Sequence, residues 1–143
     1  MVVLKQTNAH RACYFTSVQG DALKRKSVER RLWELRFTPY VFPKVKTRAS
    51  KGVDIALTTE MLSHAYRDNY DVAVLIAADA DYLPLVHEVK RQGKLVHLWF
   101  LDETCVTEEL KLAADLFFDM RPYFKHRWSS AIEQGRTQVH GRL

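Results

Sequence analysis

Residues 71–82 read DVAVLIAADADY: an unbroken apolar run follows Asp71 and leads directly into two aspartates. The six apolar residues Val72–Ala77, three of them β-branched, predict a strand that is buried on both faces. Asp79 and Asp81 follow at once, and the next ten residues have helical spacing up to Gly93, which is placed to end that helix. The two carboxylates are therefore expected at the carboxyl end of a parallel strand, the edge at which open α/β sheets bind ligands.

Two carboxylates so close in the chain repel each other unless they are protonated or share a cation. A divalent metal ion is the simplest way to offset both charges. The alternative is structural, because an Asp in a strand-to-helix turn often caps the helix that follows, and Asp81 is placed to be such an N-cap. For a pair of acids after an all-apolar strand we favour metal binding over capping.

A third acid, Asp54, stands at the start of another predicted helix, directly after the basic loop 44–51. It has its own structural explanation, because an acid in a first turn interacts favourably with the helix dipole. Acids from two strand-to-helix junctions can nevertheless converge on one hard cation, for which carboxylate oxygens are suitable ligands. Asp54, Asp79 and Asp81 are therefore the candidate ligands of a single metal site.

The composition is that of a soluble, intracellular, single-domain protein. The 143 residues are 47% hydrophobic and 27% charged, and no apolar run approaches the ~20 residues of a membrane span. The first residues, Met1 to Leu4, are followed by polar ones, so no signal peptide is expected and the predicted location is the cytoplasm. Cys13 and Cys105 stand alone and are expected to be buried thiols, with neither a zinc site nor a disulfide.

Charge is distributed unevenly along the chain. The net charge is +5; residues 24–51 hold ten Lys or Arg against two acids, whereas residues 52–120 hold five against thirteen. This pattern suits a protein that binds a polyanion at one surface and cations at another. The candidate nucleic-acid contacts are in the basic loop: Lys44, Lys46, Arg48 and Lys51. The basic helix before it has a solvated face in any case, and we expect its Trp33 to pack in the core.

Strands and helices are predicted to alternate along the chain. We expect strands at 11–18, 38–45, 72–77, 94–101 and 116–120, and helices at 21–36, 52–67, 83–92 and near 110–113. Asp21 is placed to cap the first helix. Such alternation predicts right-handed βαβ units and a parallel sheet with helices on both faces. After Arg121 the apolar pattern weakens, with Trp128 and Ile132 able to dock a last helix before a solvated tail.

Taken together, these motifs resemble those of a known family. The chain contains, in order, the turn Lys51–Asp54, the pair Tyr70-Asp71 before a strand, the turn Ala77–Asp81 with Pro84 after it, Gly93-Lys94 before a strand, and the closing Leu110 with Ala114–Phe117. This set of motifs resembles that of the NYN domain of the PIN-like nuclease superfamily, in particular its LabA/DUF88-like branch. The resemblance covers residues 12–120.

The resemblance implies a three-layer α/β/α PIN-like (Rossmann-like) fold with a mostly parallel central sheet. It implies a domain over residues 1–120, followed by a basic C-terminal extension over 121–143. It also implies an endoribonuclease-like hydrolase that cleaves RNA with Mg²⁺ or Mn²⁺. Asp54, Asp79 and Asp81 match the family's acidic positions and would be both its metal ligands and its catalytic residues, with RNA as partner and no membrane.

The chain departs from the family pattern in two places. Family members begin with a strand that ends in a further metal-binding Asp, and Met1–His10 supplies only Asn8. We expect either that an upstream strand precedes this sequence or that Met1–Leu4 or a partner chain substitutes for it. The usual Ser-Gly before the acidic turn is Ala77-Ala78 here. Both departures predict weak catalysis, and assembly into a homo-oligomer is left open.

Two other functions compete with the nuclease. An apolar strand followed by Asp-Ala-Asp also resembles the nucleophile turn of haloacid-dehalogenase-like phosphatases, although that turn belongs near the start of a chain. The basic segment could instead serve a non-catalytic RNA-binding module, which lacks metal-dependent cleavage. His64, His87 and His97 have no metal-site spacing and are expected to be structural or surface residues.

Overall fold

The computed structural model describes residues 11–44, 51–101 and 106–122, with the side chain of Lys51 excepted. The chain divides into two compact units, Met1–Met61 and Leu62–Leu143, and each is described by itself. The first holds β1 (Cys13–Val18), α2 (Ala22–Glu34), β2 (Thr38–Pro43) and most of α3 (Lys51–Tyr66). The second holds the end of α3 and the elements β3 (Val72–Ile76), η1 (Ala80–Tyr82), α4 (Leu83–Arg91), β4 (Leu95–Phe100), α5 (Glu108–Ala113) and β5 (Leu116–Asp119).

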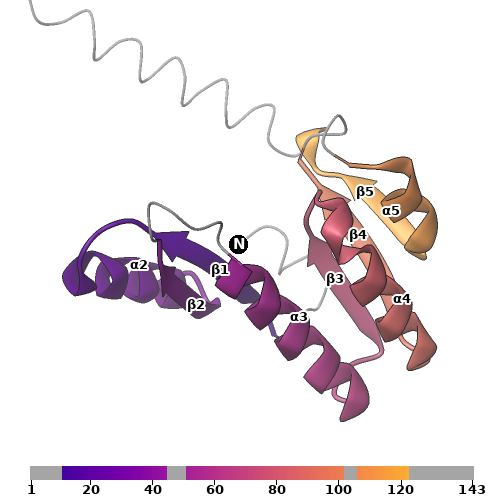
Figure 1. Ribbon diagram of the computed structural model, residues 1–143, viewed down its shortest axis with the longest axis horizontal. Coiled ribbons are helices and arrows are strands. Elements are labelled where there is room, and N and C mark those ends of the chain that lie inside the picture. The colour runs from indigo at the N-terminus through magenta and orange to yellow at the C-terminus, as the bar shows by residue number, and fades with distance from the viewer. Residues whose placement is uncertain (1–10, 45–50, 102–105, 123–143) are drawn as a thin grey trace, which may run out of the picture. The chain divides into compact units, whose positions relative to one another are not determined.

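The first unit is built on a βαβ motif. β1 and β2 pair in parallel with Cys13 opposite Thr38, and α2, which connects them, lies along both strands (Figure 1). Asp21 caps α2 as predicted, because its carboxylate accepts a hydrogen bond from the Lys24 N–H at 2.9 Å. Leu32 is the buried residue of α2. In the described residues, α2 therefore packs against the rest of its unit through the side that carries Leu32.

A polar network ties the strands of the first unit to α3. The hydroxyl of Tyr40 in β2 donates to Oε1 of Glu60 in α3 at 2.6 Å, and the Arg11 guanidinium lies 3.2 Å from the same oxygen. Burial, aided by the Glu60 hydrogen bond, raises the pKa of Tyr40 to about 12. Burial likewise raises the pKa of the half-buried Cys13 thiol. Both groups therefore stay protonated near neutral pH and act as structural groups.

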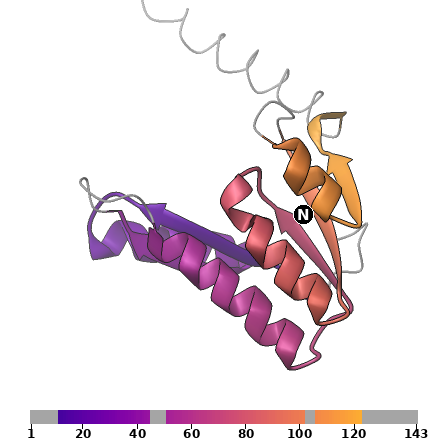
Figure 2. The same ribbon diagram turned by 45° about the vertical axis from the view of Figure 1, so that its right-hand side comes forward.

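The second unit is a three-stranded parallel sheet in the order β3-β4-β5. Figure 2 shows α4 lying over this sheet, and α4 also packs against α5. The side chains that are fully buried here come from α4, β4 and α5: Val86, Val89, Val96, Leu98 and Leu110. The core of this unit thus lies between one face of the sheet and these two helices.

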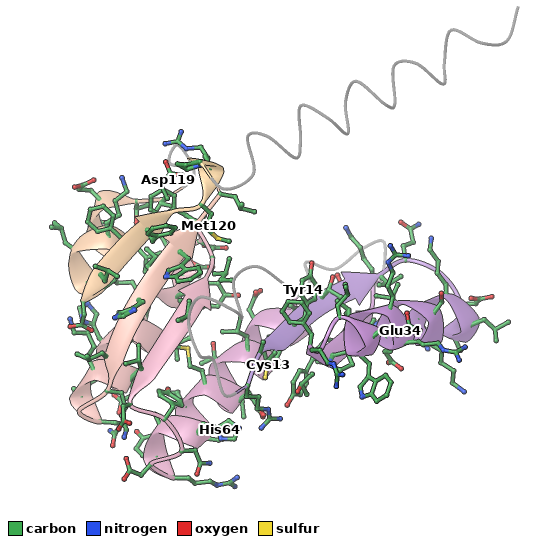
Figure 3. The ribbon with its side chains drawn as sticks, turned by 180° about the vertical axis from the view of Figure 1, so that it is seen from behind. Cys13, Tyr14, Glu34, His64, Asp119 and Met120 are labelled. Carbon is green, nitrogen blue, oxygen red and sulfur yellow. The ribbon has the colours of Figure 1, made fainter. Side chains whose placement is uncertain are left out.

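The opposite face of that sheet is exposed. Register places Leu75 of β3 beside Leu98 of β4 on the buried face, whereas Val72, Val74 and Ile76 are 40%, 38% and 50% exposed. Figure 3 views the molecule from behind, with Asp119 at the end of β5. The prediction that β3 is buried on both faces is therefore wrong, because within the described residues helices cover only one side of the sheet.

Three helices end in the same way, with a left-handed residue just after the cap. At the end of α2, Arg36 has φ 69°, and the Phe37 N–H reaches back to the Leu32 carbonyl at 3.0 Å. α3 ends with Asp68 at φ 58°, and α4 ends with Gly93 at φ 73°. These are Schellman turns, which satisfy the last carbonyls of a helix and turn the chain into the next strand. The predicted helix end at Gly93 is confirmed.

The predicted alternation of strands and helices is confirmed, with every described strand pairing in parallel. Of the helices in the described segments, none is both long and apolar enough to cross a bilayer. The expected substitute strand at Met1–Leu4 and the expected helix around Trp128 and Ile132 both lie outside the described residues.

Candidate metal centre and nucleic-acid surface

The acidic pair lies in the turn that follows β3. Asp79 has an extended backbone and is the N-cap of η1, because its Oδ1 accepts a hydrogen bond from the Asp81 N–H at 3.0 Å. Asp81 stands in the first turn of η1, and α4 begins directly afterwards at Leu83 with Pro84 in its first turn. The capping residue is thus Asp79 rather than Asp81, because a short 3₁₀ turn precedes the α-helix.

Both carboxylates are exposed to solvent, while the turn beneath them is anchored by buried Tyr82 and Leu85. No ion pair holds Asp79 or Asp81 among the residues that the structure describes. Two negative charges therefore stand two residues apart at the carboxyl end of a parallel strand. Exposed carboxylate oxygens are the donors that Mg²⁺ prefers, and it commonly binds through one or two of them together with substrate phosphates. The chemistry of the donor set fits such an ion.

Asp54 belongs to the first unit, where it lies in the first turn of α3. The pair Asp79 and Asp81 belongs to the second unit, so convergence of all three acids stays a prediction. Within the described part of each unit, no group of three or more His, Cys, Asp or Glu side chains is arranged to hold a metal ion.

Only part of the predicted basic surface lies in the described residues. Lys44 is exposed directly after β2, and its backbone N–H donates to the Val18 carbonyl at 3.0 Å. Lys51 begins α3. Lys46 and Arg48 lie outside the described residues. The role of this loop in RNA binding therefore stays a prediction.

One acid that the sequence reasoning did not select also lies at the carboxyl edge of the second sheet. Asp119 ends β5, opposite Phe100 at the end of β4. Its carboxylate accepts hydrogen bonds from the Arg121 backbone at 2.8 Å and from the Arg121 guanidinium at 2.8 and 3.0 Å. The position of Asp119 at the end of a short predicted strand could have marked it as a candidate site residue. It differs from the acidic pair because Arg121 offsets its charge.

The histidines have the structural or surface positions that were expected. Nδ1 of His64, near the end of α3, lies 2.8 Å from the amide nitrogen of Asn69 and so helps to close the turn there. His87 is exposed on α4, and His97 is half-buried in β4. In the described residues, none of them belongs to a group of three or more side chains that could hold a metal ion.

These features define a class of protein: an α/β protein with parallel βαβ units and a carboxylate pair at the carboxyl edge of one sheet. The model of the NYN domain family matches residues 2–121. The chain belongs to the NYN domain family.

A solved structure has a similar fold. A protein of unknown function from Vibrio parahaemolyticus is similar to this chain with a TM-score of 0.58 and 19% sequence identity, over 73% of this chain and 67% of that one. At this identity the likeness shows the fold, and the predicted three-layer α/β/α PIN-like fold class is confirmed. No curated protein matches the chain.

Proposed function

We propose that this chain is a ribonuclease that hydrolyses RNA phosphodiester bonds with Mg²⁺ or Mn²⁺. The observation that carries the proposal is the pair Asp79 and Asp81, two exposed carboxylates after β3 without an ion-pair partner among the described residues. Membership of the NYN family, a PIN-like nuclease group, supports it. The net charge of +5 suits a polyanionic substrate.

The protein's part in this reaction is to present oxygen ligands in a fixed position. A bound divalent ion would polarise the scissile phosphate, activate water and stabilise the leaving oxygen. The hydrogen bond from the Asp81 N–H fixes the Asp79 carboxylate, and buried Tyr82 fixes the turn that carries both acids. Asp54 matches a third acidic position of the family, and we assign it to the same centre.

The finer assignments rest on sequence motifs. We place the chain in the LabA/DUF88-like branch because of the turns Lys51–Asp54 and Ala77–Asp81. RNA is expected to contact the loop residues Lys44, Lys46, Arg48 and Lys51, and this attraction should weaken steeply with salt. We expect hydrolysis to be slow, because only three acids of these 143 residues match the family's acidic positions and Ala77-Ala78 removes a hydroxyl from the acidic turn.

A non-catalytic RNA-binding module is the second candidate. It is favoured by the fact that Asp79 already has a structural use, since its Oδ1 caps the turn Ala80–Tyr82. In that case the acidic pair would be a capping motif alone. Metal-dependent cleavage separates the two functions.

The substitution Asp79→Asn gives a clean test, because Asn also caps helices well and should preserve the turn while removing the charge. Glu109→Gln is the matched control, since it removes an exposed carboxylate on α5, away from the acidic turn in the chain. Incubation of a labelled RNA with Mn²⁺ should give products with the wild type and the control. We expect Asp79→Asn to cleave at least about tenfold more slowly, equivalent to about 1.4 kcal/mol in activation free energy.

Calorimetric titration with Mn²⁺ should show similar metal affinity for the wild type and the control variant, and weaker affinity for Asp79→Asn. Cleavage that persists in EDTA, or equal cleavage by Asp79→Asn and Glu109→Gln, would refute the metal centre. RNA binding without any hydrolysis by the wild type would favour the non-catalytic module.

A further inference from the structure

Trp33 is exposed on α2, contrary to the expectation that it packs in the core. Its side chain is 71% exposed, whereas its neighbour Leu32 is buried against the strands. Successive helical residues are rotated by about 100°, so one helix cannot bury both at the same surface. An indole carries a large, flat apolar surface, and here that surface is open to a ligand. The packing of α2 therefore does not explain this residue.

Basic side chains share the exposed side of α2 with Trp33. Lys26, Arg30 and Trp33 occupy positions i, i+4 and i+7, which form one stripe along a helix, and all three are exposed. We call these three residues the α2 stripe. Figure 3 labels Glu34, which ends this helix. An exposed aromatic ring preceded by two cations is thus presented on a single helix face.

The charge of α2 is strongly positive and only loosely balanced. The helix carries five Lys or Arg against the two acids Glu29 and Glu34, and Arg36 follows it. Nε of Arg30 lies 3.7 Å from Oε1 of Glu34, with the side chains 83% and 60% exposed. An exposed pair at this distance contributes little to stability. The Arg30 guanidinium can therefore turn to an anionic ligand at small cost.

We propose that the α2 stripe binds single-stranded nucleic acid, with one base stacked on Trp33 and adjacent phosphates contacted by Lys26 and Arg30. Proteins that bind single strands combine a cationic track for the backbone with aromatic rings on which bases stack. An acidic protein surface would use the cations but would leave the indole without a partner. The surface does not depend on the metal centre, and it rests on the proposed function only in that RNA is the expected polymer.

Binding is tested in EDTA, so that hydrolysis plays no part and a failed nuclease assay does not affect the result. The probe is a fluorescently labelled oligouridylate of about 10 nucleotides, compared with oligodeoxythymidylate and with a duplex. We expect both single strands to bind more tightly than the duplex. Tighter binding of the RNA than of the DNA would show that the stripe favours ribose, and equal binding would show that it reads bases and phosphates only.

Two substitutions separate stacking from charge. Stacking is worth about 1–3 kcal/mol per base, so Trp33→Ala should weaken affinity by a factor of about 5 to about 150. Its salt dependence should not change, because no charge is lost. Lys26→Gln should instead reduce the slope of log affinity against log salt by about 0.7. Leu112→Ala is the matched control, since Leu112 is a 77% exposed apolar residue on α5, and it should bind like the wild type.

Trp33→Phe provides a readout that does not depend on deleting the ring. It should keep affinity within about fivefold, because a phenyl ring also stacks. The quenching of tryptophan fluorescence that the oligonucleotide causes in the wild type should largely disappear. Unchanged affinity of folded Trp33→Ala, or unchanged quenching in Trp33→Phe, would overturn the proposal. A change of oligomeric state in Trp33→Ala with unaltered oligonucleotide affinity would assign the stripe to a protein interface instead.

Discussion

Asp115 connects three elements of the second unit, so its removal tests how that unit is held together. Oδ2 of Asp115 accepts a hydrogen bond from the Val96 N–H, near the start of β4, at 2.7 Å. Oδ1 lies 2.9 Å from Nζ of Lys90 near the end of α4, and that ammonium also donates to the Ala113 carbonyl at 2.8 Å. The Asp115 side chain is 25% exposed. One carboxylate thus joins β4, α4 and the end of α5.

The cost of losing this carboxylate follows from the bonds it makes. Asp115→Ala removes a charge-assisted hydrogen bond worth about 1.5–3 kcal/mol and an ion pair worth at most about 1 kcal/mol. We expect a loss of about 2–4 kcal/mol in the free energy of unfolding. Asp115→Asn keeps an acceptor for the Val96 N–H and should lose only about 1 kcal/mol. Urea unfolding followed by circular dichroism measures both, with the transition slope unchanged.

The same contacts make the effect depend on pH. The hydrogen bond from the Val96 N–H, with the Lys90 ammonium nearby, holds the pKa of the Asp115 carboxyl below its usual value. A lowered carboxyl pKa adds stability above the unfolded pKa of about 4, and this stability is lost as pH falls through the folded value. The difference in unfolding free energy between the wild type and Asp115→Asn should therefore have its full size near pH ~7 and should disappear as the pH falls below ~4.

Glu109→Gln is the control, because Glu109 is an exposed acid on α5, and it should change stability by no more than about 0.5 kcal/mol. A cost below about 0.5 kcal/mol for Asp115→Ala, or a difference that stays constant with pH, would show that the carboxylate does not hold these elements together.

Four further substitutions, two of them compared with each other, test the fold. Arg36→Gly should stabilise the protein by about 0.5–1 kcal/mol, because glycine adopts the left-handed conformation without strain; a lower urea midpoint would contradict this. Leu98→Ala, at a fully buried position of β4, should cost about 2–5 kcal/mol by the same assay, and a near-neutral result would mean that the site is poorly packed. Asp68→Asn should lower the midpoint more than Lys94→Met, because the first leaves a buried ammonium without its main partner, whereas the second leaves an exposed carboxylate; the reverse order would disprove that asymmetry.

The order of strands and helices could be predicted because it depends on local patterns. Helical spacing, the cap at Asp21 and the glycine at Gly93 are properties of short segments, and the structure has each of them. Burial depends on what lies against a face. The run Val72–Ala77 is apolar throughout, but only helix packing decides which sides of a strand are covered, and here Val72 and Ile76 stay exposed.

Details of the functional surfaces were harder to predict for the same reason. Whether Leu32 or Trp33 faces the core depends on a rotation of one position about the axis of α2, which the sequence pattern alone did not decide. The cap fell on Asp79 because a 3₁₀ turn precedes α4, and helix boundaries shift by a residue or two with such turns. The position of the two acids after a strand was predicted correctly, and their role as metal ligands stays a prediction.

The pairing of the strands affects how the chain can fold while it is being translated. Each paired strand in the described residues adjoins the strand before or after it in the chain, with one helix between them. Such pairings close short loops, which lowers the entropic barrier that makes many parallel sheets slow to form. During synthesis, β1 can therefore pair as soon as β2 has left the ribosome, before the acidic turn has emerged from it. Folding can follow translation from the first unit to the second, so that apolar strands spend little time without a partner.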